Sequence, residues 1–193
     1  MGNDGKDRRV RKTQKLLQDC LAELMKTKKV RDISVRELTE MADLNRGTFY
    51  LHYKDVFDLL EKTENGMIEE LERLMYRPRE ADMAVRLSET LADIFHLVQE
   101  NAGLVEILLG ENGDLNFITR LKLLVREKCL QEWMEMFRPS NSDYFEAYYS
   151  FIVSGCIGLV QHWIQSGMQE TPEELASLTE QIITKGIRVL ENS

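Results

Sequence analysis

The chain has 193 residues, of which 43% are hydrophobic and 30% are charged, and its formal net charge at pH 7 is -8. A chain of this size can bury a sizeable core, and we expect a soluble globular protein of one domain or two small ones. The charged N-terminus and the absence of any apolar stretch of about 18 residues argue against a secretion signal and a membrane-spanning helix, so the predicted location is the cytoplasm.

The predicted fold class is all-α, with about nine helices. Only three prolines occur, helix-forming residues are frequent, and there are no alternating Val, Ile and Thr runs bounded by turn residues. Cys20, Cys129 and Cys156 lie far apart with apolar neighbours at helical spacing. We interpret them as small core residues and expect neither a disulfide framework nor a zinc site.

The two ends of the chain differ in charge. Residues 1–56 hold 13 Lys and Arg against 9 Asp and Glu, a net charge of +4, whereas the remaining residues hold 12 against 24, a net charge of -12. Such an asymmetry is typical of a nucleic-acid-binding end joined to a body that the polyanion repels. The alternative is a basic N-terminus that is simply solvated, and charge alone does not separate the two.

The first part of the chain predicts three helices. Residues 9–28 carry apolar side chains at spacings of one, three and four, which indicates an amphipathic helix. A second, short helix is expected at residues 34–42, where Ser34 opens a Ser-x-x-Glu capping box. Asn45 can cap a third helix at residues 46–53. Two short helices joined by a tight turn form a helix-turn-helix.

One side of the third helix is predicted to face a ligand. At about 100° per residue, the side chains of Arg46, Tyr50 and Lys54 fall on one arc, which also holds Gly47 and Leu51. This arc presents cationic and phenolic groups around a residue without a side chain, which fits close approach to a sugar-phosphate backbone in the major groove. Leu51 is either a contact for a thymine methyl group or an exposed leucine without a role.

The other side of the third helix is predicted to be core. Phe49 and Tyr53 share it and, together with Leu44, should pack on the first two helices. Thr48 and His52 lie on the flank between the two sides, where a hydroxyl or imidazole can reach a phosphate or satisfy a neighbouring backbone group. For His52 both alternatives stay open.

The segment RDISVRELTEMADLNRGTFYLHYKDVFDLL resembles the DNA-binding region of the TetR family of bacterial transcriptional regulators, over roughly residues 10–60. The resemblance combines the capping serine, the A-D-L-N turn, the R-G-T-F-Y-x-H-Y-K run and the helix that follows. It implies an all-helical homodimer that reads a double-stranded DNA operator and carries a divergent C-terminal effector-binding and dimerisation domain. On matching positions, it implies DNA contacts by Arg36, Arg46, Thr48, Tyr50, His52 and Lys54. Many members carry a further lysine where this chain has Val56, which puts one phosphate contact per subunit in doubt.

Six more helices are predicted beyond the helix-turn-helix. A linking helix begins after the N-cap Asp55 and continues towards Met75, before Arg77-Pro78-Arg79 breaks it. The others are expected at residues 83–99, 103–109, 114–137, 143–165 and 171–191, the last opened by Thr171 and Pro172. We place the domain boundary within the linking helix, which gives a helix-turn-helix domain of residues 1–64 and a helical-bundle domain of residues 65–193.

The last two helices are the predicted dimer interface. Small residues on one and an apolar stripe on the other would form a four-helix bundle across a two-fold axis. The alternative is that both helices only complete the core of their own subunit. The predicted interface residues are Ser154, Gly155, Gly158, Leu175, Leu178, Ile182 and Ile187.

An effector cavity between the middle helices is a further prediction, because cavities in helical bundles are mostly apolar with few polar groups. Its candidate lining residues are His96, Trp133, Met136, Tyr148 and Trp163. The alternative is that these side chains are ordinary core. His96 and Glu100 lie one helical turn apart without a third ligand, so no metal site is expected. No nucleophile or nucleotide-binding motif indicates an enzyme or a cofactor.

The segment FIVSGCIGLVQHWIQSGMQETPEELA also resembles the C-terminal region of a TetR subgroup that includes regulators of dihydroxyacetone kinase operons. This resemblance implies that the signal can be a protein contact instead of a small molecule. The main prediction is a homodimeric DNA-binding repressor in which an effector alters the spacing of the two helix-turn-helix domains. The alternative is a transcriptional co-activator that contacts DNA weakly and is regulated by a partner protein.

Overall fold

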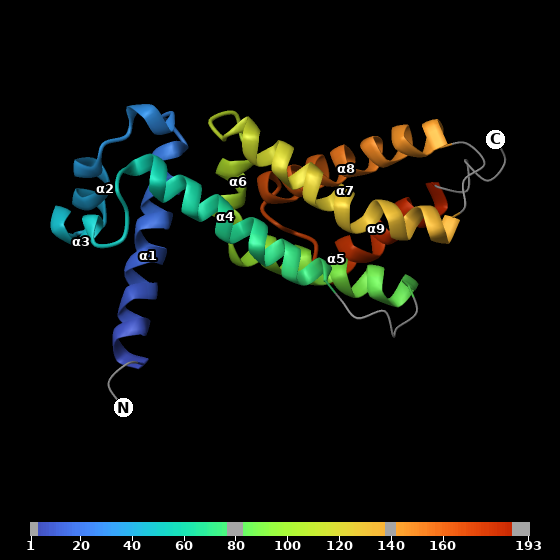
Figure 1. The fold of residues 1–193 in the computed structure, drawn as a ribbon, viewed down its shortest axis with the longest axis horizontal. Helices are drawn as coiled ribbons and strands as arrows, with labels where there is room; N and C mark the ends of the chain where they lie inside the picture. The colour runs from blue at the N-terminus through green and yellow to red at the C-terminus, as the bar shows by residue number, and fades with distance from the viewer. Residues whose placement is uncertain (1–3, 77–82, 138–141, 187–193) are drawn as a thin grey trace. The chain divides into compact units, whose positions relative to one another are not determined.

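The computed structural model describes residues 4–76, 83–137 and 142–186, and within these ranges it contains nine α-helices, one 3-10 helix and no strands (Figure 1). The predicted all-α fold class is therefore confirmed. The helices are α1 (Asp4–Met25), η1 (Val30–Asp32), α2 (Val35–Met41), α3 (Arg46–Tyr50), α4 (Val56–Met75), α5 (Met83–Glu100), α6 (Ala102–Leu108), α7 (Leu115–Phe137), α8 (Ser142–Gln165) and α9 (Pro172–Gly186).

Several helices of the N-terminal part differ from those expected. Helix α1 begins at Asp4, earlier than predicted, and η1 was not predicted at all. Helix α3 ends at Tyr50, with Leu51 as its C-cap, instead of continuing to about Tyr53. The predicted break at residues 77–79 and the end of the last predicted helix, from Ile187 on, lie outside the described residues.

The predicted capping box at Ser34 and the predicted N-cap at Thr171 are confirmed. The Ser34 backbone N–H donates to Glu37 Oε2 at 2.9 Å, and the Glu37 N–H donates to Ser34 Oγ at 3.2 Å. Before α9, Thr171 and Glu174 make the same reciprocal pair at 2.8 and 3.2 Å. Each pair satisfies two backbone donors that the first turn of a helix leaves without a partner.

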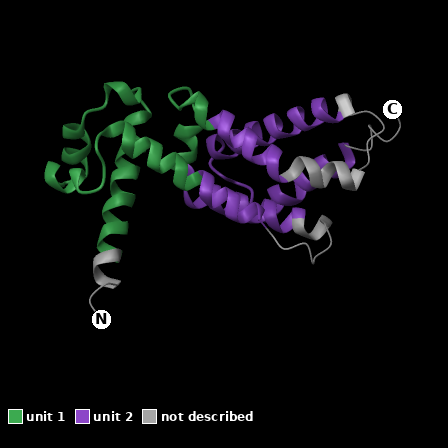
Figure 2. Ribbon diagram, viewed as in Figure 1, with its two compact units in different colours: residues 1–67, 103–117 green, residues 68–102, 118–193 purple. Residues whose placement is uncertain are grey.

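The chain forms two compact units, coloured separately in Figure 2. Unit 1 comprises Met1–Met67 and Gly103–Phe117, and unit 2 comprises Ile68–Ala102 and Ile118–Ser193. Helix α4 is therefore divided between the units. Helix α6 and the loop after it join unit 1, where the side-chain amide of Asn112 donates to the Met25 carbonyl oxygen at 3.0 Å.

The core of unit 1 is built by its first four helices. Helix α1 packs on α2, and α2 packs on α3. The side chains of Leu17, Leu38, Phe49 and Leu59 have no solvent exposure, and that of Tyr53 has 4%. The predicted burial of Phe49 and Tyr53 is thus confirmed. Their burial anchors the short α3, which has too few residues to be stable alone.

Unit 2 is a helical bundle in which α5 packs along α9. Its main apolar cluster joins α8 to α9 and contains Phe145, Tyr149, Ile152, Val153 and Ile183. Among the helices of the described ranges, none has the length and apolar character that crossing a bilayer demands.

Candidate nucleic-acid interface

A tight turn and a polar cap position α3. Asp43 ends α2 in the left-handed region at φ 51°, and the Leu44 N–H donates back to the Thr39 carbonyl oxygen at 2.9 Å. This arrangement is a Schellman motif, with aspartate in the place that glycine usually takes. Asn45 Oδ1 then accepts from both the backbone N–H of Thr48, at 2.8 Å, and its hydroxyl, at 3.1 Å. The predicted N-cap is confirmed, and the Thr48 hydroxyl takes part in it.

Helix α3 has the two sides that its periodicity predicts. Phe49 is fully buried, whereas Tyr50 is 58% exposed and Leu51 is 81% exposed. The rings of Phe49 and Tyr50 meet edge to face, with centroids 5.5 Å apart. Because Phe49 is fixed in the core, Tyr50 projects from the surface. We call the exposed residues Arg46, Gly47, Tyr50, Leu51 and Lys54 the α3 face.

Gly47 has a local reason to lack a side chain. A Cβ atom added there would lie 3.1 Å from Asn45 Oδ1, the oxygen that caps α3. That distance is tighter than nine in ten real Cβ contacts. A larger residue would therefore press on the cap as well as on any molecule lying against the α3 face.

Hydrogen bonds to side chains of α4 hold the segment that follows α3. The Lys54 N–H donates to Asp58 Oδ2 at 2.9 Å, and the Asp58 N–H donates to Asp55 Oδ1 at 2.8 Å, which confirms Asp55 as an N-cap. Lys62 Nζ donates to the His52 carbonyl oxygen at 3.1 Å. The angle predicted for Lys54 assumed a continuous helix and is wrong for that reason, although Lys54 is exposed.

Lys62 and Asp58 hold this segment in place. Lys62 Nζ lies 2.9 Å from Asp58 Oδ2 and 5.3 Å from the centre of the Tyr53 ring. The Lys62 ammonium and the Lys54 N–H lower the pKa of the Asp58 carboxyl group. Neither Asp58 nor Lys62 was predicted as a site residue, although their i, i+4 spacing on α4 is a known signal for such a pair.

His52 contributes to this network through its backbone. Its imidazole is half-buried and lies beside the Tyr53 ring, with centroids 6.2 Å apart.

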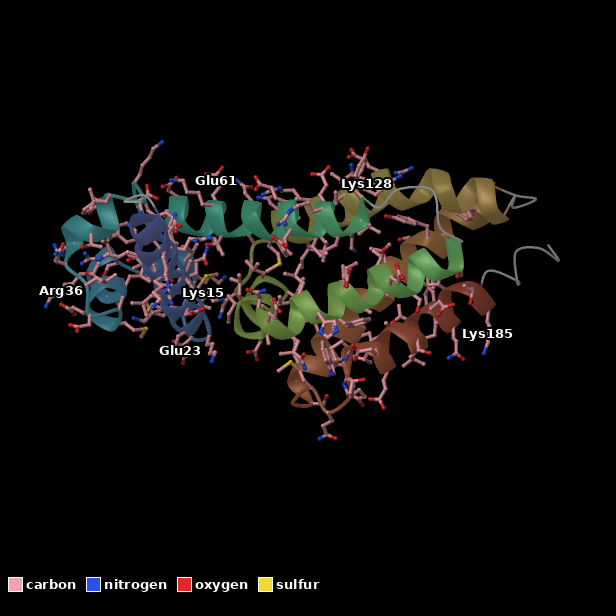
Figure 3. The ribbon with its side chains drawn as sticks, turned by 90° about the horizontal axis from the view of Figure 1, so that it is seen from below. Lys15, Glu23, Arg36, Glu61, Lys128 and Lys185 are labelled. Atoms are coloured by element: carbon pink, nitrogen blue, oxygen red, sulfur yellow. The ribbon has the colours of Figure 1, made fainter. Side chains whose placement is uncertain are left out.

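Arg36, on α2, is the other predicted DNA contact. Its Nε lies 2.6 Å from Glu40 Oε1, and both side chains are more than 60% exposed. Figure 3 shows Arg36 on the outer surface of unit 1. A phosphate would have to bind the remaining guanidinium nitrogens or displace Glu40. Val56, the residue that departs from the family pattern, is only 4% exposed and is part of the core.

A second exposed surface lies on α8 and α9. Ser154, Gly155 and Gly158 are exposed along one side of α8, next to Phe151, which is 72% exposed and was not predicted as a site residue. On α9, Leu178 and Ile182 are each 46% exposed. We call these six residues the α8–α9 surface. Of the other predicted interface residues, Leu175 is buried within its own subunit at 3% exposure, and Ile187 lies outside the described residues.

The candidate effector residues lie in different environments. Trp163 is fully buried against Phe95, and its indole N–H donates to the Glu170 carbonyl oxygen at 3.1 Å. The Tyr148 hydroxyl donates to the Ile183 carbonyl oxygen. His96 is exposed, and its Nε2 lies 2.8 Å from Glu173 Oε1. The side chains of Trp133 and Met136 lie outside the described part. Within that part, no three His, Cys, Asp or Glu side chains are grouped to hold a metal ion.

A sequence comparison decides the family. A profile of the TetR type, described as a transcriptional regulator C-terminal region, matches residues 86–185, which is more than half of the chain. The chain belongs to the TetR family of transcriptional regulators. This match in the C-terminal part confirms the family that the N-terminal segment resembles. A search of curated proteins found no significant match.

Solved structures of other TetR-type regulators share the fold. The dihydroxyacetone kinase operon activator DhaS has a TM-score of 0.59 and 18% identity, covering 92% of this chain and 97% of DhaS. A TetR regulator from Streptococcus agalactiae 2603V has the same TM-score and coverage, with 21% identity. A TetR-like regulator from Rhodococcus sp. RHA1 has a TM-score of 0.68 and 14% identity, covering 91% of this chain and 96% of the other. At these identities the likeness shows a common TetR fold and no more.

Proposed function

We propose that this TetR-family protein is a homodimer that binds a two-fold symmetric double-stranded DNA operator through the α3 face. The exposed Tyr50 beside Arg46, on a helix whose opposite side is anchored by the buried Phe49, is the observation that carries the proposal. A guanidinium and a phenol can donate to base edges or phosphates, and a helix of this size fits the major groove.

Dimerisation would occur through the α8–α9 surface. Exposed apolar side chains beside two glycines allow close helix packing, and burying them would exclude water from Phe151, Leu178 and Ile182. In a two-fold dimer, the two α3 helices must lie about 34 Å apart to enter successive major grooves. Any change in the body that alters this distance would weaken binding, which is the expected route of regulation.

An effector would act by binding one spacing of the two α3 helices better than another. Coupling of about 1 to 3 kcal/mol between two sites changes affinity about 5- to 150-fold. The effector is either a small molecule bound near His96, Tyr148 and Trp163 or a protein partner. Repression is the expected output, because a dimer on its operator blocks access to the DNA.

The second candidate function is that of a co-activator controlled by a partner protein. Two observations favour it. Val56 is buried where a further phosphate-binding lysine was expected, which weakens the DNA contact. One solved structure with the same fold is named as an operon activator. A co-activator would bind DNA weakly alone and tightly with its partner.

The test is a footprint of the purified protein on the DNA upstream of its own gene. We expect a protected site with two-fold symmetry, and Tyr50→Ala should weaken binding to it by at least about 30-fold while leaving helicity and dimerisation unchanged. Unchanged affinity of Tyr50→Ala would remove the α3 face from the proposal. A footprint that forms only after a partner protein is added would favour the co-activator.

A further inference from the structure

The positive charge of the N-terminal region lies almost wholly in its first 15 residues. These contain 6 Lys and Arg against 2 Asp and Glu, a net charge of +4, which equals the excess counted over residues 1–56. Residues 16–56, which include the helix-turn-helix, contain 7 of each and have no net charge. A substantial part of the electrostatic attraction to DNA should therefore come from outside the α3 face.

The cations of α1 are arranged as a stripe. At about 100° per residue, Arg8, Arg11, Lys12 and Lys15 fall within an arc of about 100°, and all four are exposed. We call them the α1 stripe. Lys15, labelled in Figure 3, pairs with Asp19 at 3.3 Å. Lys26, just beyond the end of α1, pairs with Glu23, and the other three cations of the stripe have no acidic partner among the described side chains.

This half of α1 is not needed for the core. The buried residues of α1 begin at Leu17 and continue to Met25, and none of residues 8–16 is buried. In Figure 1 the N-terminal turns of α1 extend beyond α2 and α3. Cations three and four residues apart repel one another, and positive charge near a helix N-terminus opposes the helix dipole. The stripe weakens the helix that carries it, and stability does not account for it.

Five cations of residues 16–56 lie outside the α3 face, and four of them are paired with acidic side chains. Lys28 binds Glu37, and Arg36 binds Glu40. Such internal pairs leave the surface around the α3 face close to neutral. A sequence-reading surface of this kind would need a separate source of affinity for phosphate.

We propose that the α1 stripe binds the phosphate backbone of the same DNA duplex, outside the bases read by the α3 face, and supplies about half of the salt-dependent part of the affinity. This inference rests on the proposed DNA-binding function. An anionic membrane is a less suitable partner, because a membrane-binding helix presents an exposed apolar side beside its cations. Residues 8–16 hold two aliphatic side chains, Val10, which is half-buried, and Leu16, which is 41% exposed, and these two alone do not form an apolar side.

The salt dependence of DNA binding tests the proposal. If the α3 face neutralises about three phosphates per subunit and the stripe about three more, the slope of log affinity against log salt is about -10 for the dimer. The variant Arg8→Ala/Arg11→Ala/Lys12→Ala should have a slope of about -5 and bind a mixed-sequence duplex at least about tenfold more weakly. Alanine favours helix, so α1 should remain folded, which circular dichroism would check.

The matched control is Lys26→Ala/Lys29→Ala/Arg31→Ala, which removes the same charge from exposed positions of unit 1. An equal loss in the control would show that overall charge is responsible and would overturn the role of the stripe. An unchanged slope in the stripe variant would overturn it as well. So would a variant that keeps its duplex affinity and loses binding only to vesicles containing phosphatidylserine.

Tyr50→Ala separates this inference from the proposed function. It should lose preference for the operator while keeping the steep slope on mixed-sequence duplex. If Tyr50→Ala loses operator binding and the stripe variant behaves as wild type, the inference fails and the proposed function stands. If the wild-type protein binds no duplex in low salt, both the proposed function and the role of the α1 stripe are contradicted.

Discussion

The α3 face and the α8–α9 surface both expose a large ring, but their surroundings differ. Tyr50 stands among Arg46, Lys54 and the polar cap of α3, whereas Phe151 stands among small residues of α8. The Tyr50 ring carries a hydroxyl group that can donate and accept hydrogen bonds, whereas the Phe151 ring has no polar atom. Exposure alone thus says little about a ring, because its neighbours determine whether water, a polyanion or an apolar surface suits it best.

The difference also concerns how each ring is held. Tyr50 projects because Phe49, its neighbour in sequence, is buried, and the turns on either side of α3 are fixed by hydrogen bonds. Phe151 projects because α8 turns Phe145, Tyr149 and Ile152 towards the core of its own subunit. The first ring is displayed by a small, closely capped element, and the second by a long helix packed on its other side.

The largest effect is expected from charging the α8–α9 surface. Leu178→Glu/Ile182→Glu would bury unpaired carboxylates in a dimer interface, at a cost of about 3 to 5 kcal/mol or more. The dimer dissociation constant should rise about 100-fold or more, as measured by sedimentation. Leu115→Glu, which changes an exposed leucine of unit 1, is the control and should remain dimeric. A double variant that stays dimeric would leave the α8–α9 surface without a role in assembly.

A smaller effect is expected from Lys62, which orders the segment behind the α3 face. Lys62→Ala removes the donor to the His52 carbonyl oxygen and the partner of Asp58. Since each such hydrogen bond contributes about 1 kcal/mol and the one to the His52 carbonyl oxygen is lost in both subunits, we expect operator affinity to fall roughly 30-fold per dimer. Amide hydrogen exchange in residues 51–54 should become faster. Lys29→Ala serves as the control, and equal behaviour of the two variants would exclude a positioning role for Lys62.

Leu51 distinguishes base contact from simple exposure. If it contacts a thymine methyl group, Leu51→Ala should weaken operator binding about fourfold per half-site. The loss should disappear on an operator in which uracil replaces thymine, because the methyl group is then missing. A wild-type affinity for the unmodified operator would mean that Leu51 is exposed without a role.

The smallest expected effect is on thermal stability and comes from the capping box of α2. Hydrogen bonds from Lys28 and Ser34 lower the pKa of Glu37 from 4.5 to about 2. A lowered pKa stabilises the fold above about pH 4.5, and this contribution is lost as the pH falls through about 2. Glu37→Gln should therefore lower the melting temperature by about 1 to 3 °C near neutral pH. The difference from wild type should shrink on acidification; a constant difference would contradict the assignment.

Local signals along the chain predicted most of the helices. Four helix starts were marked by an N-cap residue, and in the structure each of these side chains accepts a hydrogen bond from a backbone N–H: Ser34, Asn45, Asp55 and Thr171. The spacing of Phe49 and Tyr53 predicted which side of α3 is buried. These features depend on residues at most four positions apart, so they can be recognised without knowing the rest of the fold.

What the amino-acid order determined by itself is therefore the helical fold class, the capped helix-turn-helix, the two-sided α3 and the concentration of positive charge in the first residues. Only the tertiary structure decided how the segment after α3 is held, because Lys62 approaches it from ten residues away. It also placed Leu175 inside its subunit and Leu178 and Ile182 outside, although all three belong to one apolar stripe of α9. A stripe predicts that side chains will be buried, but which neighbour buries them depends on contacts between distant segments.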